Sequence, residues 1–213
     1  QREIRKYLLG RFPGHSFLGE EGGETKTGTW EYRWVVDPLD GTTNYIRGLR
    51  NFCVSVAVEH REVGVIAGAI YDPMHDDLYT AVLHGGAFLN GKRIRVSGTR
   101  LLRLAVLTTG FAYSKGGNLS RDMRLFHRLN EKALAVRRPG SAALDLCFVA
   151  SGVFDAFWER GLSPWDVAAG MLIVKEAGGI VTRYNGKGEP GLWDRELLAS
   201  NRLVHKKVAA ELG

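Results

Sequence analysis

The middle of the chain alternates between apolar and polar residues with a period of two. The stretch "CVSVAVEH" (residues 53–60) shows this alternation clearly, and the pair Asn90 and Gly91 is typical of a tight hairpin turn. Alternation of this kind favours strands that have one buried face. We therefore predict a run of strands over residues 53–106, rich in antiparallel pairs, and another strand over residues 103–111.

The last third of the chain alternates between helix patterns and strand patterns instead. Apolar residues at helical spacing predict helices over residues 120–132, 141–152 and 163–179. Short apolar runs predict strands over residues 134–138, 153–160, 179–184 and 197–201, with a C-terminal helix after the last one. The whole pattern predicts an α/β fold with mixed α+β layers. It does not determine the order of the strands.

The N-terminal part of the chain predicts short elements, two of which end on acidic residues. We expect a helix over residues 2–10, a strand over 15–21, a glycine-rich polar loop over 22–29, a strand over 32–37 and a short helix after Asp40. The strand over 32–37 is apolar until its last residue, Asp37. A rigid scaffold can aim acidic groups that stand at the ends of strands, so these positions are candidates for function.

Composition and charge restrict the class of protein. The chain has 213 residues, of which 45% are hydrophobic, and this is enough to bury a sizeable core. Its net charge of +6 suits anionic ligands, but the basic residues form no stripe with interleaved aromatics, so we do not expect nucleic acid as the main partner. No apolar run is long enough to span a membrane. Cys53 and Cys147 lie far apart in apolar surroundings, which predicts core thiols and a cytoplasmic setting.

Acidic residues at the ends of predicted elements are the main candidates for chemistry. They are Glu20, Glu21, Asp37, Asp40 and Asp166. Each also has a simple structural interpretation. Asp166 lies three residues after Ser163 in a capping-box arrangement, Asp40 fits the cap of the helix that opens at Gly41, and the two glutamates fit a solvated turn.

Considered together, these acids indicate a metal site beside a phosphate site. Asp37 and Asp40 are too close for both to ionise without a cation. Mg²⁺ prefers oxygen ligands and often binds substrate phosphate as well. Gly41 and Thr42 then offer backbone N–H groups at the start of a helix, where an anion is favoured. The glycine-rich motifs of nucleotide-binding proteins do not occur, so metal-assisted hydrolysis is preferred to nucleotide-dependent transfer.

Three blocks of the sequence carry a family resemblance. In order and spacing, "GEE", "WVVDPLDGTTNY" and "WDVAAG…EAGG" resemble the signature blocks of the inositol monophosphatase family, within the lithium-sensitive, Mg²⁺-dependent phosphatase superfamily. The resemblance covers essentially the whole chain. It implies a layered α/β/α/β/α sandwich of the inositol monophosphatase/fructose-1,6-bisphosphatase type, commonly a homodimer. We expect one domain over residues 1–213, in which residues 1–103 form a metal-binding half and residues 104–213 complete the substrate site.

The resemblance implies two to three Mg²⁺ ions in each active site. A first ion would be bound by Glu20, Asp37 and the backbone carbonyl of Leu39. A second would be bound by Asp37, Asp40 and Asp166, so that Asp37 bridges the two ions. Glu20 would also contribute, largely through water, to a weaker third site.

The resemblance also implies how the substrate is held. Gly41 and Thr42 would donate backbone N–H groups to the phosphate, and the Thr42 hydroxyl would position the attacking water. Thr42, Asp37 and Glu20 are thus the expected catalytic residues. The other residues implied to contact the substrate are Gly140, Ser141, Ala142, Glu159 and Asp166.

The expected activity is Mg²⁺-dependent hydrolysis of a small phosphorylated polyol or sugar, with inositol 1-phosphate as the first choice. Glu159 and the form "DGTTN" favour an inositol-type pocket. Fructose-1,6-bisphosphatase activity, alone or in the same protein, is the alternative. A binding role in RNA or transcription complexes is a more distant one. The resemblance also implies inhibition by lithium.

One family feature is not in the sequence as given. An aspartate-threonine-aspartate segment near the N-terminus of the family supplies an acid that partners the threonine equivalent to Thr42. We therefore expect the N-terminal helices of the fold to be incomplete in this sequence. A real loss of the segment would instead preserve the metal sites and impair the activation of water.

Overall fold

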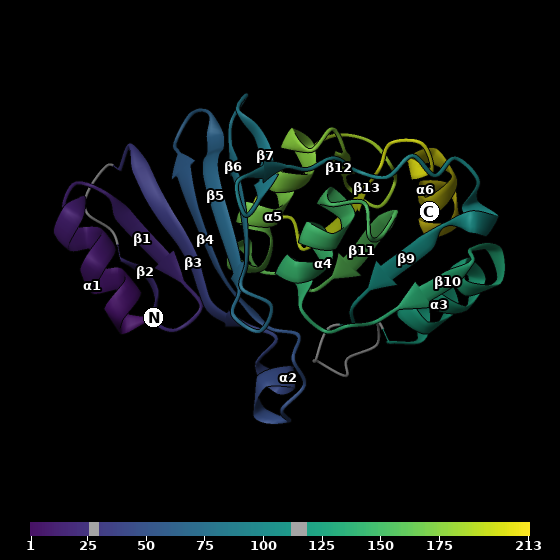
Figure 1. Ribbon diagram of the computed structural model, residues 1–213, viewed down its shortest axis with the longest axis horizontal. Coiled ribbons are helices and arrows are strands. Elements are labelled where there is room, and N and C mark those ends of the chain that lie inside the picture. Colours follow the sequence, from purple (N-terminus) through teal and green to yellow (C-terminus); the bar gives the residue numbers. More distant parts are fainter. Residues whose placement is uncertain (26–29, 112–118) are drawn as a thin grey trace.

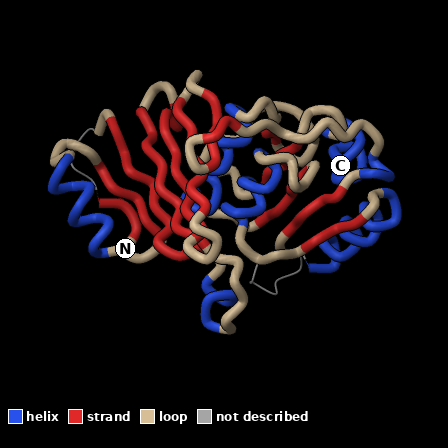
Figure 2. The backbone as a smooth tube through the Cα atoms, in the orientation of Figure 1, coloured by secondary structure: helices blue, strands red, loops and turns tan. Residues whose placement is uncertain are grey.

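The computed structural model describes residues 1–25, 30–111 and 119–213, which form two β-sheets with helices between and around them (Figures 1 and 2). The helices are α1 (Arg2–Arg11), α2 (Thr42–Ile46), the 3₁₀ helix η1 (Leu102–Leu104), α3 (Leu119–Lys132), α4 (Ala142–Ala150), α5 (Pro164–Glu176) and α6 (His205–Leu212). Helices α4 and α5 lie between the sheets, α1 packs on the outer side of the first sheet, and α3 and α6 pack outside the second (Figure 1). This arrangement confirms the predicted α/β/α/β/α layers.

The first sheet has eight strands in the order β2-β1-β3-β4-β5-β6-β7-β8. They are β1 (Ser16–Gly19), β2 (Gly23–Thr25), β3 (Tyr32–Asp40), β4 (Cys53–His60), β5 (Gly64–Asp72), β6 (Asp77–Val82), β7 (Gly86–Leu89) and β8 (Lys92–Arg93). Neighbours are antiparallel except β1 and β3, which are parallel. In β4, the predicted alternation buries Cys53, Ser55 and Ala57 on one face.

The second sheet has five strands in the order β10-β9-β11-β13-β12. They are β9 (Val106–Thr109), β10 (Ala135–Arg137), β11 (Ala156–Arg160), β12 (Ile180–Thr182) and β13 (Glu196–Ser200). The first three are mutually parallel, with α3 connecting β9 to β10 and α4 connecting β10 to β11, while β13 runs antiparallel to both of its neighbours. The predicted alternation of helix and strand in this half is therefore confirmed.

The two central helices are buried on all sides because each lies between sheets. Every residue of α5 from Val167 to Val174 is buried, as expected for a helix without a polar face. Close packing depends on glycine: a Cβ at Gly170 would lie 2.5 Å from Leu146 of α4, and a Cβ at Gly68 of β5 would lie 2.9 Å from the backbone of α5. The free thiols of Cys53 and Cys147 belong to this core, as predicted.

Four predicted boundaries are wrong. The run of strands expected over residues 53–106 ends with β8, and residues 94–101 form no helix or strand. The loop predicted over residues 22–29 contains the edge strand β2, because a polar segment can pair at the edge of a sheet. Residues 26–29 of the predicted loop lie outside the described residues. The strand expected over 103–111 is only β9, preceded by η1, and it ends where Gly110 makes room for a carboxylate. Strand β3 continues to Asp40 through a bulge, because Asp40 still pairs with Cys53 of β4.

In the described residues, no helix is long and apolar enough to cross a membrane.

Candidate active site

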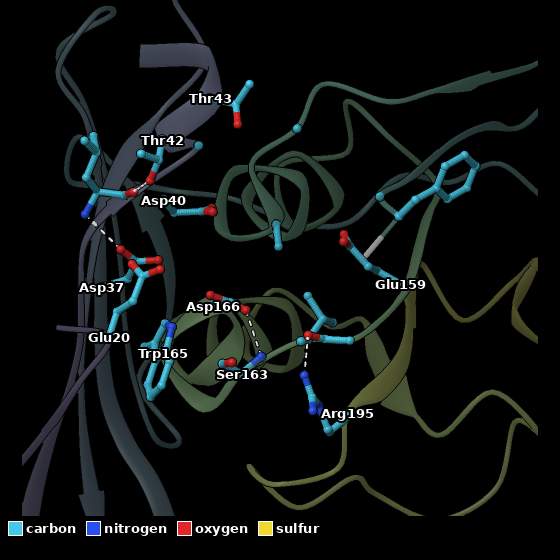
Figure 3. Close-up of a pocket in the computed structure, with 18 of the residues that line it drawn as sticks. Glu20, Asp37, Asp40, Thr42, Thr43, Glu159, Ser163, Trp165, Asp166 and Arg195 are labelled. Carbon is cyan, nitrogen blue, oxygen red and sulfur yellow. Dashed lines mark hydrogen bonds between the residues drawn. The ribbon is translucent and has the colours of Figure 1, made fainter. Parts of the chain in front are cut away.

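One cavity of about 570 Å³ lies between strand ends from both sheets. Its walls come from the ends of β1 and β3, the segment after β9, the end of β11 and the start of α5 (Figure 3). It is lined by Glu20, Asp37, Leu39, Asp40, Gly41, Thr42, Thr43, Gly110, Phe111, Arg138, Gly140, Ala142, Glu159, Gly161, Leu162, Ser163, Trp165, Asp166 and Arg195. The predicted site residues therefore line this cavity, except Ser141 and Glu21.

Strand topology explains why two of the acids meet. Gly19 of β1 pairs with Val36 of β3 in parallel register, so the next residues along the two strands, Glu20 and Asp37, lie side by side. Figure 3 shows their carboxylates side by side. Asp37 is 2% exposed, whereas Glu20 is exposed at the rim.

Asp37 is a buried acid whose environment disfavours its charge. Its Oδ1 accepts a hydrogen bond from the Leu39 N–H at 2.8 Å. Burial, followed by the nearby charge of Asp40, raises its pKa to about 8, and the Leu39 N–H opposes the rise. Without a cation, this carboxyl therefore holds a proton at neutral pH.

Asp40 joins β3 to a helix of the other half of the chain. Its Oδ2 accepts hydrogen bonds from the Ser141 hydroxyl at 2.6 Å and from the Ala143 N–H at 2.8 Å. These groups form the N-terminus of α4, where a carboxylate is stabilised. The interpretation of Asp40 as the cap of α2 is wrong, because the N-cap of α2 is Gly41, with a left-handed φ of 87°, and no side chain caps this helix. Burial raises the pKa of Asp40, and the donor groups oppose the rise.

Asp166 caps helix α5 and also lines the cavity. It forms the predicted capping box with Ser163, whose N–H donates to Asp166 Oδ2 at 2.8 Å. Burial raises the pKa of Asp166 to about 7, and the charges of Asp40 and Glu20 add to the rise. One carboxylate oxygen is used by the cap, and the residue still lines the cavity. The capping interpretation and a binding role are therefore compatible.

The segment before α4 lines the cavity, except for Ser141. Gly140 has a left-handed φ of 88°, and Asn44 of α2 donates to the neighbouring Pro139 carbonyl at 2.8 Å, which ties the two segments together. Ser141 itself is 1% exposed and caps α4 by accepting from Leu144 N–H at 3.3 Å. The hydroxyl of Ser141 contacts Asp40. Contact between Ser141 and the substrate stays a prediction.

Glu159 lies on the opposite side of the cavity from Asp37 (Figure 3). Burial raises its pKa to about 8, the charges of Asp40 and Asp166 add to the rise, and Arg138 opposes it. A Cβ at Gly110 would collide with the Glu159 carboxylate, so only glycine leaves space for this side chain. Without a cation in the cavity, burial therefore favours the protonated form of Glu159.

Several cavity residues were not identified from the sequence. Arg138 stands in a basic pair and stacks on Phe111, with its guanidinium 4.6 Å from the ring centroid. Trp165 directly precedes Asp166 in the block "WDVAAG", so its position in the sequence could have indicated it. Arg195 lies alone in a polar loop, and no pattern in its neighbourhood indicates a site. Only the fold brings it to the cavity.

The donor set fits hydrated Mg²⁺ better than a bare ion in a closed cage. Among the residues described, no three His, Cys, Asp or Glu side chains are close enough to hold an ion together. Asp37, Asp40 and Asp166 each commit one oxygen to protein N–H or O–H groups. Mg²⁺ needs few carboxylates, since it retains waters and binds phosphate oxygens. A cation would also favour the charged forms of these acids and so oppose the rise in their pKa values that burial and, to a smaller extent, mutual repulsion cause.

The chain is similar in sequence to proteins of one known family. Residues 1–213 match the model of the inositol monophosphatase family. The chain is 47% identical over 191 residues to the inositol-1-monophosphatase of Rhizobium meliloti, which covers 89% of this chain and 71% of the relative. It is 45% identical to Nus factor SuhB of Pseudomonas aeruginosa, over 89% of this chain and 71% of the relative. It is 41% identical to the fructose-1,6-bisphosphatase/inositol-1-monophosphatase of Aquifex aeolicus, over 96% of this chain and 75% of the relative.

Solved structures share the fold. Extragenic suppressor protein suhB from Bartonella henselae is 38% identical with a TM-score of 0.94, over 99% of this chain and 80% of that one. SaIMPase-II bound to inositol monophosphate is 30% identical with a TM-score of 0.84, over 97% and 79%. A Ca-bound family protein from Staphylococcus aureus is 27% identical with a TM-score of 0.85, over 99% and 80%. The chain therefore belongs to the inositol monophosphatase family, a family of metal-dependent phosphatases.

Proposed function

We propose that this protein hydrolyses inositol 1-phosphate to inositol and inorganic phosphate with Mg²⁺ as its cofactor. The observation that carries the proposal is the convergence of Glu20, Asp37, Asp40 and Asp166 on one cavity beside Gly41 and Thr42. Relatives named inositol-1-monophosphatase and a neighbour bound to inositol monophosphate support the choice of substrate. In this reaction the P–O bond to inositol breaks, the hydroxyl of water joins the phosphorus, and the inositol oxygen gains a proton.

The acids of β1, β3 and α5 are proposed to hold the metal ions. Glu20, Asp37 and the Leu39 carbonyl would bind one ion. Asp37, Asp40 and Asp166 would bind another partly through its bound waters, since the three carboxylates do not surround one point in the described residues. Glu20 would support a weaker third ion through water. When bound, Mg²⁺ neutralises the phosphate dianion and lowers the pKa of a bound water. The Leu39 N–H fixes the Asp37 carboxylate, and the start of α4 fixes the Asp40 carboxylate.

Gly41 and Thr42 are proposed to hold and orient the reacting groups. Their backbone N–H groups would bind phosphate oxygens. The Thr42 hydroxyl donates its hydrogen to the Leu39 carbonyl at 3.0 Å. Its oxygen is thereby left as an acceptor that can orient the attacking water. A side chain at position 41 would clash with the Asn51 carbonyl, since its Cβ would lie 2.8 Å away.

The polyol is proposed to lie against Gly140, Ala142 and Glu159. A protonated Glu159 can donate one hydrogen bond to a substrate hydroxyl and accept another. This carboxyl is positioned by the space at Gly110. Asp166, which also lines the cavity, would contact the substrate as well.

A comparison of kcat/KM tests the proposal. Inositol 1-phosphate, fructose 1,6-bisphosphate, histidinol phosphate and 3′-phosphoadenosine 5′-phosphate would be offered with Mg²⁺, and inositol 1-phosphate is expected to react fastest. Asp40→Asn serves as the inactive control. Failure on all four substrates would overturn the proposal of a small phosphate monoester.

Fructose-1,6-bisphosphatase activity is the second candidate. A relative at 41% identity carries both activities in its name, and two arginines line the cavity here. A role in transcription complexes is the more distant alternative, suggested by relatives named Nus factor. Salt-dependent RNA binding that survives Asp40→Asn would favour that role.

We also propose a homodimer. Family resemblance supports this assembly, and light scattering at several concentrations tests it. A mass of one chain throughout the concentration range would contradict the dimer.

A further inference from the structure

The side-chain amide of Asn44 joins two segments of the cavity wall that come from different halves of the chain. Asn44 lies on α2, outside the set of described residues that line the cavity. Its Nδ2 donates to the Asn51 carbonyl at 2.7 Å and to the Pro139 carbonyl at 2.8 Å, so both N–H donors of the amide are used. The second bond crosses 95 positions of the sequence. It reaches residues 139–142, before and at the start of α4, which we call the polyol segment.

The bond to Asn51 supports the phosphate turn, by which we mean Gly41 and Thr42. The Asn51 carbonyl packs so closely against this turn that a Cβ at Gly41 would lie 2.8 Å from it. The backbone carbonyl of Asn44 also accepts from the Leu49 N–H at 2.9 Å, which closes the loop between α2 and β4. One residue therefore contacts the loop behind the phosphate turn and, through its other N–H, the polyol segment.

The polyol segment is attached to the first half of the chain at two points. At one end, the Pro139 carbonyl accepts from Asn44 and also from Nδ2 of Asn51, at the longer distance of 3.3 Å. At the other end, the Ser141 hydroxyl donates to the carboxylate of β3 described above. Gly140 lines the cavity between these two points, with a left-handed φ of 88° that favours glycine. The position of Gly140 in the cavity wall therefore depends on both attachments.

We propose that Asn44 is a positioning residue that sets the polyol segment against the phosphate turn, and thereby determines how well the enzyme binds the polyol part of its substrate. The inference rests on the proposed function, because it assumes that the phosphate lies at the phosphate turn and the polyol lies against the polyol segment. Without the Asn44 amide, the Pro139 carbonyl would keep the longer of its two amide donors.

The phosphate turn has attachments that do not involve the Asn44 side chain. Strand β3 stays paired with β4 up to Asp40, and the Gly41 carbonyl accepts from the Tyr45 N–H at 3.0 Å. Loss of the amide should therefore displace the polyol segment more than the phosphate turn.

Inositol 1-phosphate and p-nitrophenyl phosphate distinguish the two segments, because the second ester has no hydroxyl groups on its leaving group. Asn44→Ala should raise KM for inositol 1-phosphate about 3- to 10-fold, as expected for the loss of one hydrogen bond between neutral groups. The kcat for this substrate should change by less than about twofold, because both bonds of the amide go to carbonyls outside the proposed metal sites. For p-nitrophenyl phosphate, kcat/KM should also change by less than about twofold.

Two further variants separate positioning of the polyol segment from other effects. Asn51→Ala removes the second donor to Pro139 but keeps the backbone carbonyl beside Gly41, so it should act in the same direction by a smaller factor. Asn130→Ala, at an exposed position on α3, should leave the kinetics of both substrates unchanged. An equal fall in kcat/KM for both esters in Asn44→Ala would assign the amide to the phosphate turn and would overturn the proposal.

Hydrogen exchange keeps the test independent of the substrate. In the protein with Mg²⁺ added, Asn44→Ala should speed amide exchange at residues 140–143 and leave exchange in α5 unchanged. Unchanged exchange at residues 140–143 would refute positioning by Asn44. A wild type that does not hydrolyse inositol 1-phosphate, together with faster exchange at these residues in the variant, would refute only the proposed substrate.

Discussion

Removal of the Ser141 hydroxyl should weaken the binding of Mg²⁺, although this residue does not line the cavity. The hydroxyl donates to Asp40 Oδ2 at 2.6 Å and also caps α4 at the Leu144 N–H. Ser141→Ala leaves the Ala143 N–H as the main remaining donor to this carboxylate from α4. The Asp40 carboxylate then becomes harder to ionise and less firmly oriented.

The two lost interactions have different expected magnitudes. A hydrogen bond to a charged group contributes about 1.5–3 kcal/mol, which corresponds to an approximately 10- to 100-fold weaker affinity for Mg²⁺. Loss of the helix cap lowers the free energy of unfolding by about 1 kcal/mol. Ser141→Thr retains a hydroxyl and should recover most of both quantities.

Calorimetric titration with Mg²⁺ and urea unfolding measure the two effects separately. Ser151→Ala is the matched control, because it removes a hydroxyl from the other end of α4, where Ser151 donates to the Cys147 carbonyl at 2.9 Å. This control should lower stability without changing Mg²⁺ affinity. In a double-mutant cycle, Asp40→Asn should make the effect of Ser141→Ala on affinity small. Wild-type Mg²⁺ affinity in Ser141→Ala would refute the positioning of Asp40 by α4.

Three further predictions follow from the cavity. Burial raises the pKa of Asp37 in the folded protein from its ordinary 3.8 to about 8, so the metal-free protein should lose stability as pH rises from about 4 to 8. Mg²⁺ should oppose this loss in thermal unfolding. A melting temperature of the metal-free protein that rises with pH would contradict the prediction. Gly110→Ala should raise KM for inositol 1-phosphate by displacing Glu159, whereas Gly10→Ala, where a Cβ meets nothing within 4 Å, should not. Lithium should inhibit phosphate release, and full activity in lithium would count against a second metal site at Asp40.

Local pattern was sufficient to predict most of the elements. The alternation over residues 53–60 predicted β4, and the apolar run before Asp37 predicted the strand that carries it. The edge strand β2 was missed because its composition is that of a loop. Strand order was not predictable, since no local pattern records that β1 pairs in parallel with β3.

The candidate site was predictable where its residues are close in sequence and special in chemistry. Asp37, Asp40, Gly41 and Thr42 lie in one block, and the block is recognisable. The contact between Asp40 and Ser141 spans 101 positions and depends on where α4 begins. Arg195 was missed because an exposed arginine in a polar loop looks like ordinary surface. Such contacts arise only when the two sheets are assembled around α4 and α5.

Phosphate release from inositol 1-phosphate by the wild type and by Asp37→Asn tests the central claim most directly. With Mg²⁺ present, the wild type should be active and lose its activity in a chelator. Asp37→Asn should lower kcat by about 100-fold or more, because the proposed bridging ligand is lost. An Asp37→Asn enzyme with wild-type kcat, or wild-type activity that persists in the chelator, would contradict metal-assisted hydrolysis in this cavity.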